Sequence, residues 1–240
     1  IYKKLTGKKY DHRDTLTVYL DLKKKYNNVT IAIEPAKIFQ DKSHSPYAED
    51  IGDLFPLSGK SLSKTLHCNE NGYYSIYESD RYGFNNPDKE WDNETIEYLL
   101  IGDSFTHGSC VNRPDDIASI LRKISKKSVL NLGMMGNGPL TEYATLKEYY
   151  KDKTKNILWM FFEGNDISGL QLELKNNTLV KYFNDKNFKQ NLKFKQKSID
   201  DLKLKYIPDK NKSIIINNTF FDFIKLTKIR HQIKIFKKIK

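Results

Sequence analysis

The alternation of apolar runs with helical segments between residues 93 and 170 constrains the fold of this chain more than any other feature. Residues 96–101, 129–132 and 157–162 are apolar runs of strand length, and residues 117–124 and 140–150 between them have helical spacing. Strand, helix, strand, helix, strand with short connections is typical of right-handed βαβ units, in which helices cover both faces of a parallel sheet. The sequence therefore predicts an α/β fold with buried parallel strands.

The segments on either side are less regular. Residues 13–26 have apolar side chains at near-helical spacing and predict an amphipathic helix, and residues 29–33 alternate like a short strand. Residues 35–87 are rich in Ser, Asn, Gly, Tyr and Pro and predict loops with short β pieces such as 73–77. The predicted division is an N-terminal lead-in or cap (residues 1–92), the core of the domain (93–170), and a Lys-rich helical insertion or start of a C-terminal part (171–240).

The composition fits one or two soluble globular domains. The 240 residues are 38% hydrophobic, and 15 Tyr and 13 Phe supply large apolar side chains that disordered chains lack. The longest apolar run, residues 157–162, is far shorter than the roughly 18 residues of a membrane span. These numbers exclude wholesale disorder and a membrane-spanning segment in this sequence.

The positive charge is concentrated at the C-terminal end. The formal net charge is +11, and residues 167–240 hold 18 basic against 6 acidic side chains. Such a basic block can bind nucleic acid, acidic glycans or an anionic membrane surface. Only five of the 41 basic residues are Arg, the residue that base and bidentate phosphate recognition favour. We therefore expect solvated Lys-rich helices, such as one predicted at residues 220–239, rather than specific nucleic-acid binding.

Cys68 and Cys110 leave two readings open. Two cysteines are too few for a disulfide framework, and neither has metal-ligand spacing to other Cys or His residues beyond its neighbours His67 and His107. One structural disulfide and two small buried thiols are both consistent with the sequence. No metal site and no cofactor is predicted.

Distinctive sequences follow each predicted strand, where parallel sheets bind ligands. The first is Gly102-Asp103-Ser104, in which a serine at a strand-to-helix turn is placed for nucleophilic attack, although such a turn is often only a helix N-cap. The second, residues 131–139, holds three glycines whose spacing does not match a dinucleotide fingerprint. The third is Gly164-Asn165-Asp166, in which the Asn side chain either donates into the crevice or closes an Asx turn.

In this order and spacing, the three sequences resemble the SGNH (GDSL-type) hydrolases, a family of esterases and lipases. The resemblance implies a flavodoxin-like three-layer α/β/α sandwich and hydrolysis of an acyl ester, without a cofactor. It implies Ser104 as the nucleophile, an oxyanion hole formed by the N–H groups of Ser104 and Gly136 and the Asn165 amide, and Gly102, Asp103, Gly164 and Asp166 as supporting residues. Residues 77–88 resemble the lead-in of bacterial envelope-associated members, which implies a cell-envelope location and a glycan or lipid acyl ester, with O-acetyl first among the candidates.

The family's catalytic base does not follow the third motif. In SGNH hydrolases the base is a His in a late D-x-x-H motif, and this chain offers only His44, which lies before Ser104, and His231, in a Lys-rich segment. His107 is expected on the helix surface or in contact with substrate. One hypothesis is a truncated esterase, in which further strands and the D-x-x-H motif would follow residue 240. The alternative is a catalytically inactive SGNH-fold module that binds an acylated or anionic glycan or lipid.

Overall fold

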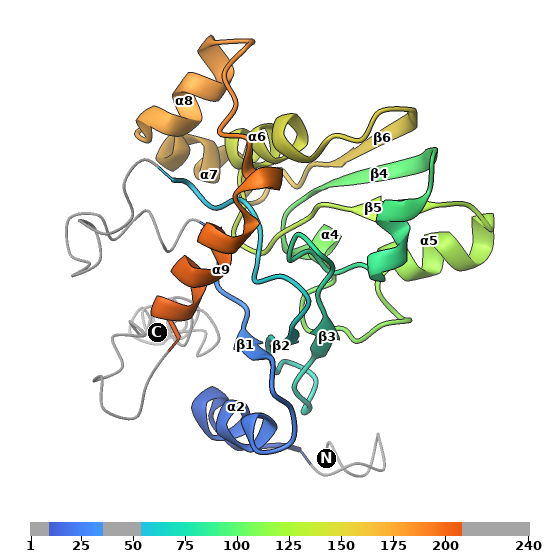
Figure 1. The fold of residues 1–240 in the computed structure, drawn as a ribbon, viewed down its shortest axis with the longest axis vertical. Coiled ribbons are helices and arrows are strands. Elements are labelled where there is room, and N and C mark those ends of the chain that lie inside the picture. Colours follow the sequence, from blue (N-terminus) through green and yellow to red (C-terminus); the bar gives the residue numbers. More distant parts are fainter. Residues whose placement is uncertain (1–9, 36–53, 208–240) are drawn as a thin grey trace, which may run out of the picture. The chain divides into compact units, whose positions relative to one another are not determined.

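A computed structural model describes residues 10–35 and 54–207 of the chain (Figure 1). The chain divides into two compact units, residues 1–207 and 208–240, and all described residues belong to the first unit. The predicted helix at 220–239 and the histidines His44 and His231 lie outside the described residues.

A small parallel sheet contains the three strands that the sequence predicts. Its strands are β4 (Ile96–Gly102), β5 (Val129–Asn131) and β6 (Thr154–Met160), in the order β5-β4-β6, and both pairs are parallel. Helix α5 (Ile117–Ser125) connects β4 to β5, and helix α6 (Pro139–Tyr149) connects β5 to β6. The predicted βαβ connectivity and the α/β character are confirmed.

The period-two alternation of β4 assigns its side chains to opposite faces of the sheet. Leu99 and Ile101 are fully buried in the main core cluster together with Ala144 of α6. Leu100, one position away, belongs instead to a second cluster with Ala118 of α5. Helices therefore pack against both faces of the central strand, which explains why this run is almost uniformly apolar.

The third strand is not buried, which corrects the prediction for residues 157–162. Ile157, Leu158 and Trp159 are 44%, 39% and 43% exposed, and Phe161 and Phe162 lie beyond the end of the strand. Among the described residues, β6 pairs only with β4, so it forms an edge of the sheet. Its ILWM run is as apolar as part of a central strand, so the apolar sequence alone does not distinguish this exposed edge strand from a buried one.

A second sheet lies in the N-terminal part. Strands β1 (Val29–Ile31) and β2 (Lys64–Leu66) are parallel, and β3 (Ile76–Glu78) is antiparallel to β2. Helix α2 (Thr15–Lys23) begins after Asp14, whose carboxylate accepts a hydrogen bond from Thr17 N–H at 2.7 Å. The predicted helix and first strand are confirmed, whereas the β piece expected at 73–77 is displaced to 76–78.

Segments outside residues 93–170 contribute directly to the main core. Phe55, Phe84 and Trp91 are buried in the same cluster as the β4 side chains, and Tyr182 and Ile199 join it from the C-terminal side. Burying one side chain of this size contributes on the order of 2 kcal/mol. The other elements are η1 (Asp88–Asp92), α4 (Ser104–His107), α7 (Asp166–Glu173), α8 (Asn177–Asn184), η2 (Leu192–Phe194) and α9 (Gln196–Lys205).

Cys68 and Cys110 form a disulfide, and both side chains are buried. Of the two readings that the sequence left open, the disulfide is the one observed. It joins the segment after β2 to the segment after α4, across a sequence separation of 42. In the part of the chain that the structure describes, no helix combines the length and hydropathy that crossing a membrane requires.

Candidate active site

The turn from β4 into α4 presents Ser104 at the carboxyl end of the sheet. A Cβ at Gly102 would lie 2.1 Å from Thr106 Oγ1, so only glycine lets α4 turn back so closely over the strand end. Asp103 is the N-cap of α4 and accepts a hydrogen bond from Phe105 N–H at 3.0 Å. Ser104 is half-buried, and its hydroxyl has no hydrogen-bond partner among the described residues.

Asn165 lies beside this turn, held by the carboxylate that caps α4. Its Nδ2 donates to Asp103 Oδ2 at 3.0 Å, while Asp103 itself is buried. An amide nitrogen carries two hydrogens, and Asp103 takes one of them. Asn165 is exposed, so its second N–H can donate to a ligand, and its partner Asp103 directly precedes Ser104 in the chain. Asn165 is the N-cap residue of α7, so it does not directly follow the strand.

Gly164 and Asp166 shape the chain that carries Asn165. A Cβ at Gly164 would lie 2.6 Å from the tip of the exposed Phe162 ring, so glycine lets this ring pack closely over the loop. Asp166 Oδ2 accepts a hydrogen bond from Phe162 N–H at 2.6 Å and closes the loop between β6 and α7. Burial of its carboxyl group raises the pKa of Asp166, and the nearby charge of Asp103 adds to this effect.

The glycine loop after β5 packs against α4. A Cβ at Gly133 would lie 2.6 Å from the Thr106 side chain, and Met135 N–H donates to His107 Nδ1 at 3.1 Å. Gly136 is exposed and has φ +79, a conformation that favours glycine. A Cβ there would also lie 2.8 Å from Glu34 Oε2. The three motifs that the sequence singles out thus meet at one end of the sheet.

A buried polar network from the lead-in fixes the position of these loops. Asn86 Nδ2 donates to Asp80 Oδ2 at 2.9 Å and to Asn131 O at 2.8 Å, and Asn131 N–H donates back to Asn86 Oδ1 at 2.9 Å. The Asn131 side chain then joins Thr106 O of α4 to Gly133 N–H of the glycine loop. Asp80 and Asn86 of the 77–88 segment, hydrogen-bonded to Asn131, thus hold the loops of the site in place; we call this network the clamp.

Asp80 is the acidic centre of this clamp. It is fully buried and accepts hydrogen bonds from Trp91 Nε1 at 2.7 Å and from the backbone N–H groups of Tyr82 and Phe84. Burial raises the pKa of Asp80 to about 6, although these hydrogen bonds and that from Asn86 oppose the rise.

His107 is a core residue and not a surface or substrate-contacting one, which corrects the expectation from the sequence. It is fully buried, its Nδ1 accepts from Met135 N–H, and its Nε2 lies 3.1 Å from Tyr77 Oη. Its ring also stacks on His67 with centroids 4.7 Å apart. Burial holds the pKa of His107 well below its usual range, so the ring is neutral. Both ring nitrogens are occupied, and His107 cannot serve Ser104 as a base.

Glu142 interacts electrostatically with three other carboxylates near the site, those of Asp166, Asp103 and Glu173. Glu142 of α6 is fully buried and accepts from Trp159 Nε1 at 2.6 Å, while its Oε1 has no partner among the described residues. Burial raises the pKa of Glu142 to about 8, with the charges of Asp166, Asp103 and Glu173 adding to the rise. In the described part, no group of three or more His, Cys, Asp or Glu side chains is arranged to hold a metal ion.

Several residues at the site escaped the sequence analysis. Glu173 of α7 caps the start of α6, accepting from the N–H groups of Gly138 and Leu140 at 2.9 and 2.8 Å. Asn137, next to Gly136, is 5% exposed, and neither polar atom of its side chain has a partner in the described part. The Gly136-Asn137-Gly138 run was a usable signal for Asn137, whereas nothing local in the sequence marks Glu34 or Glu173.

The comparisons with known proteins returned no match. No family model, curated protein or solved structure matches this chain.

Proposed function

We propose that this chain is a serine ester hydrolase of the SGNH type, built on a flavodoxin-like three-layer arrangement of which the described residues form the crevice-bearing part. The single observation that carries the proposal is the hydrogen bond from Asn165 to Asp103, beside Ser104. This hydrogen bond fixes the exposed Asn165 amide next to the residue before Ser104 and leaves its second N–H available to donate, which supports a role in an oxyanion hole. A serine at a strand-to-helix turn and an oriented amide donor are two of the components that acyl transfer requires.

In the proposed reaction, Ser104 Oγ attacks the ester carbonyl and transfers its proton to a base. The carbonyl oxygen gains negative charge, which Asn165 Nδ2 and the N–H groups of Ser104 and Gly136 would stabilise. The C–O bond to the alcohol then breaks, the alcohol takes up the proton, and water hydrolyses the acyl-serine. The exposed rings of Phe105 and Phe162, with centroids 5.5 Å apart, offer an apolar surface beside Ser104 for the acyl group.

The two buried histidines of the described part, His67 and His107, are not available as the base for this reaction. His107 is fully engaged in the core, and His67 contacts its ring and the Met135 sulfur. His44 and His231 are the histidines of the sequence that lie outside the described part. Their Ala variants test this point directly, because loss of a base lowers turnover and leaves Ser104 in place.

Covalent labelling tests the proposal. A fluorophosphonate probe should label the full chain, Ser104→Ala should abolish the label, and Asn165→Ala should slow labelling by about two orders of magnitude. Ser119→Ala, a half-buried serine on α5, is the matched control and should label normally. Absence of labelling in a folded full chain would refute esterase function.

A second function is favoured by one observation: among the described residues, no histidine is hydrogen-bonded to the Ser104 hydroxyl. In this alternative the crevice only binds an acylated or anionic glycan or lipid of the cell envelope. It predicts saturable binding of an O-acetylated glycan that survives Ser104→Ala, together with no fluorophosphonate label. Labelling of the wild-type chain at Ser104 would exclude this alternative.

A further inference from the structure

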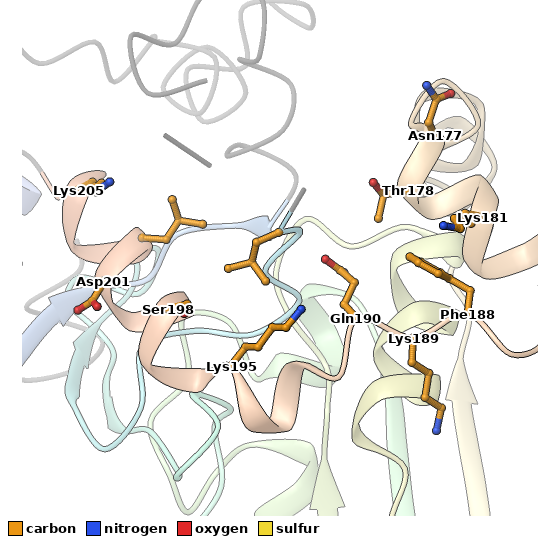
Figure 2. A pocket seen from close by; sticks show the side chains of 12 residues that line it. Asn177, Thr178, Lys181, Phe188, Lys189, Gln190, Lys195, Ser198, Asp201 and Lys205 are labelled. Atoms are coloured by element: carbon orange, nitrogen blue, oxygen red, sulfur yellow. The ribbon is translucent and has the colours of Figure 1, made fainter. Parts of the chain in front are cut away.

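A pocket of about 850 Å³ is lined by residues of α8, the segment before α9, and α9, and by none of the candidate active-site residues. Figure 2 shows its lining side chains, which come from residues 177–205 with one contribution from Leu54. Nothing in the proposed esterase mechanism uses this pocket.

The lining of the pocket carries an excess of positive charge. Four of the lining residues are lysines, and one, Asp201, is acidic. Asp201 already pairs with Lys197 of the same helix, at 3.2 Å. Within the described residues, Lys181, Lys189 and Lys195 form no ion pair with a carboxylate. The lining therefore carries a net positive charge, which attracts an anion.

Two helices begin at the pocket and add to the positive potential. Asn177 and Thr178 are the first two residues of α8, while Lys195 and Ser198 belong to the N-cap and first turn of α9. No side chain caps the N-terminus of α9. At α8 the Asn176 side chain accepts from the N–H groups of Thr178 and Leu179, so only the N-terminus of α9 offers uncapped N–H groups to an anion, and both helix ends contribute partial positive charge. The hydroxyl groups of Thr178 and Ser198 have no partner in the described part and can donate to the same ligand.

Three lining side chains, those of Leu54, Phe188 and Leu202, are apolar, and the amide of Gln190 is bonded to Phe55 and Tyr182. Lys181 Nζ lies 4.4 Å from the centroid of the Phe188 ring, and Leu54 and Leu202 also line the pocket. This combination fits a compact ligand with an apolar body and several anionic groups. The basic lining contains no Arg and one aromatic ring, a poor match to the stacking and bidentate contacts that nucleic acids use.

We propose that this pocket binds a multiply charged anion that carries carboxylate or phosphate groups, independently of the esterase site. Calorimetric titration of the full chain with citrate and with inorganic triphosphate tests this. Citrate represents a carboxylate source and triphosphate a phosphate source. We expect one-to-one binding of at least one probe, weakening at least tenfold between 50 and 300 mM NaCl.

Charge-matched variants separate the pocket from the net charge of the protein. Lys181→Gln/Lys195→Gln should weaken binding at least tenfold, and both side chains are exposed, so the fold should persist. The control Lys123→Gln/Lys127→Gln removes the same charge from exposed positions on and after α5 and should change the affinity less than twofold.

Three outcomes would overturn the proposal. The first is the absence of any heat of binding for either probe at concentrations up to about 10 mM, which is about ten times the dissociation constant of a weak, millimolar site. The second is an equal loss of affinity in both double variants, which would assign the effect to net charge. The third is a single-stranded oligonucleotide that binds the same lysines more tightly than either small anion, which would favour nucleic acid.

Discussion

Replacing Asn86 with alanine should destabilise this chain strongly, because its side chain makes four hydrogen bonds in the core. Asn86 is 1% exposed, and besides its bonds with Asp80 and Asn131 it accepts from Arg122 at 2.7 Å. Each such bond contributes a net of about 1 kcal/mol, and a buried partner left unpaired costs about 1–3 kcal/mol. We expect Asn86→Ala to lower the free energy of unfolding by about 3–5 kcal/mol.

Urea denaturation followed by circular dichroism measures this loss. Asn187→Ala is the matched control, because Asn187 is exposed and only its backbone N–H is hydrogen-bonded, so its stability should change by less than about 0.5 kcal/mol. The denaturant slope should stay constant, so that the midpoint shift reports stability. A loss below about 1 kcal/mol for Asn86→Ala would refute the view that the 77–88 segment clamps the site.

Three further variants test buried charges and the disulfide. The pKa of Glu142 is raised to about 8, so between pH 5 and 8 the folded chain holds a proton that the unfolded chain has lost. The free energy of unfolding should therefore fall as the pH rises through this range, by up to about 1.4 kcal/mol per pH unit. Glu142→Gln should remove this dependence, and a stability difference from wild type that is constant with pH would count against it. Burial lowers the pKa of Lys203 to about 7, so here the unfolded chain binds the extra proton and stability should rise from pH 7 to 10. Urea titrations should show Lys203→Met losing that rise, and an unchanged slope would contradict the lowered pKa. The free energy of unfolding of the double variant Cys68→Ala/Cys110→Ala should be about 2–4 kcal/mol lower than that of the wild type, because the disulfide closes a loop of sequence separation 42. The reduced wild type should show the same decrease, and a much smaller decrease on reduction would assign the effect of the variant to the lost side chains.

Local patterns in the sequence were enough to predict most of the secondary structure around the candidate site. The runs at 96–101 and 129–132 become β4 and β5 because both strands are buried, and buried strands leave an unbroken apolar signature. Helices α5 and α6 begin within one residue of their predicted starts, at Asp116 as an N-cap and at Pro139. Turn residues and caps act over a few positions, so the sequence records them directly.

The candidate site was only partly predictable, because local sequence patterns report interactions over a few positions and not contacts between distant loops. The Ser104, Gly136 and Asn165 motifs mark strand ends, and the carboxyl ends of parallel strands share one edge, so their proximity follows from the topology. The contact between Asn165 and Asp103 depends on the side-chain geometry of two loops that lie far apart in the sequence. No local pattern encodes it.

By itself, the sequence determined the succession of three strands along the chain and their parallel direction, the helices between them and the edge of the sheet where polar residues gather. Tertiary structure alone decided which apolar strand is exposed, that Cys68 and Cys110 pair, and that His107 is a neutral core residue. The physical reason is the distance along the chain over which each kind of interaction acts. Periodicity and capping report interactions within one or two turns of chain, whereas burial, pairing and pKa depend on neighbours that only the folded chain brings into contact.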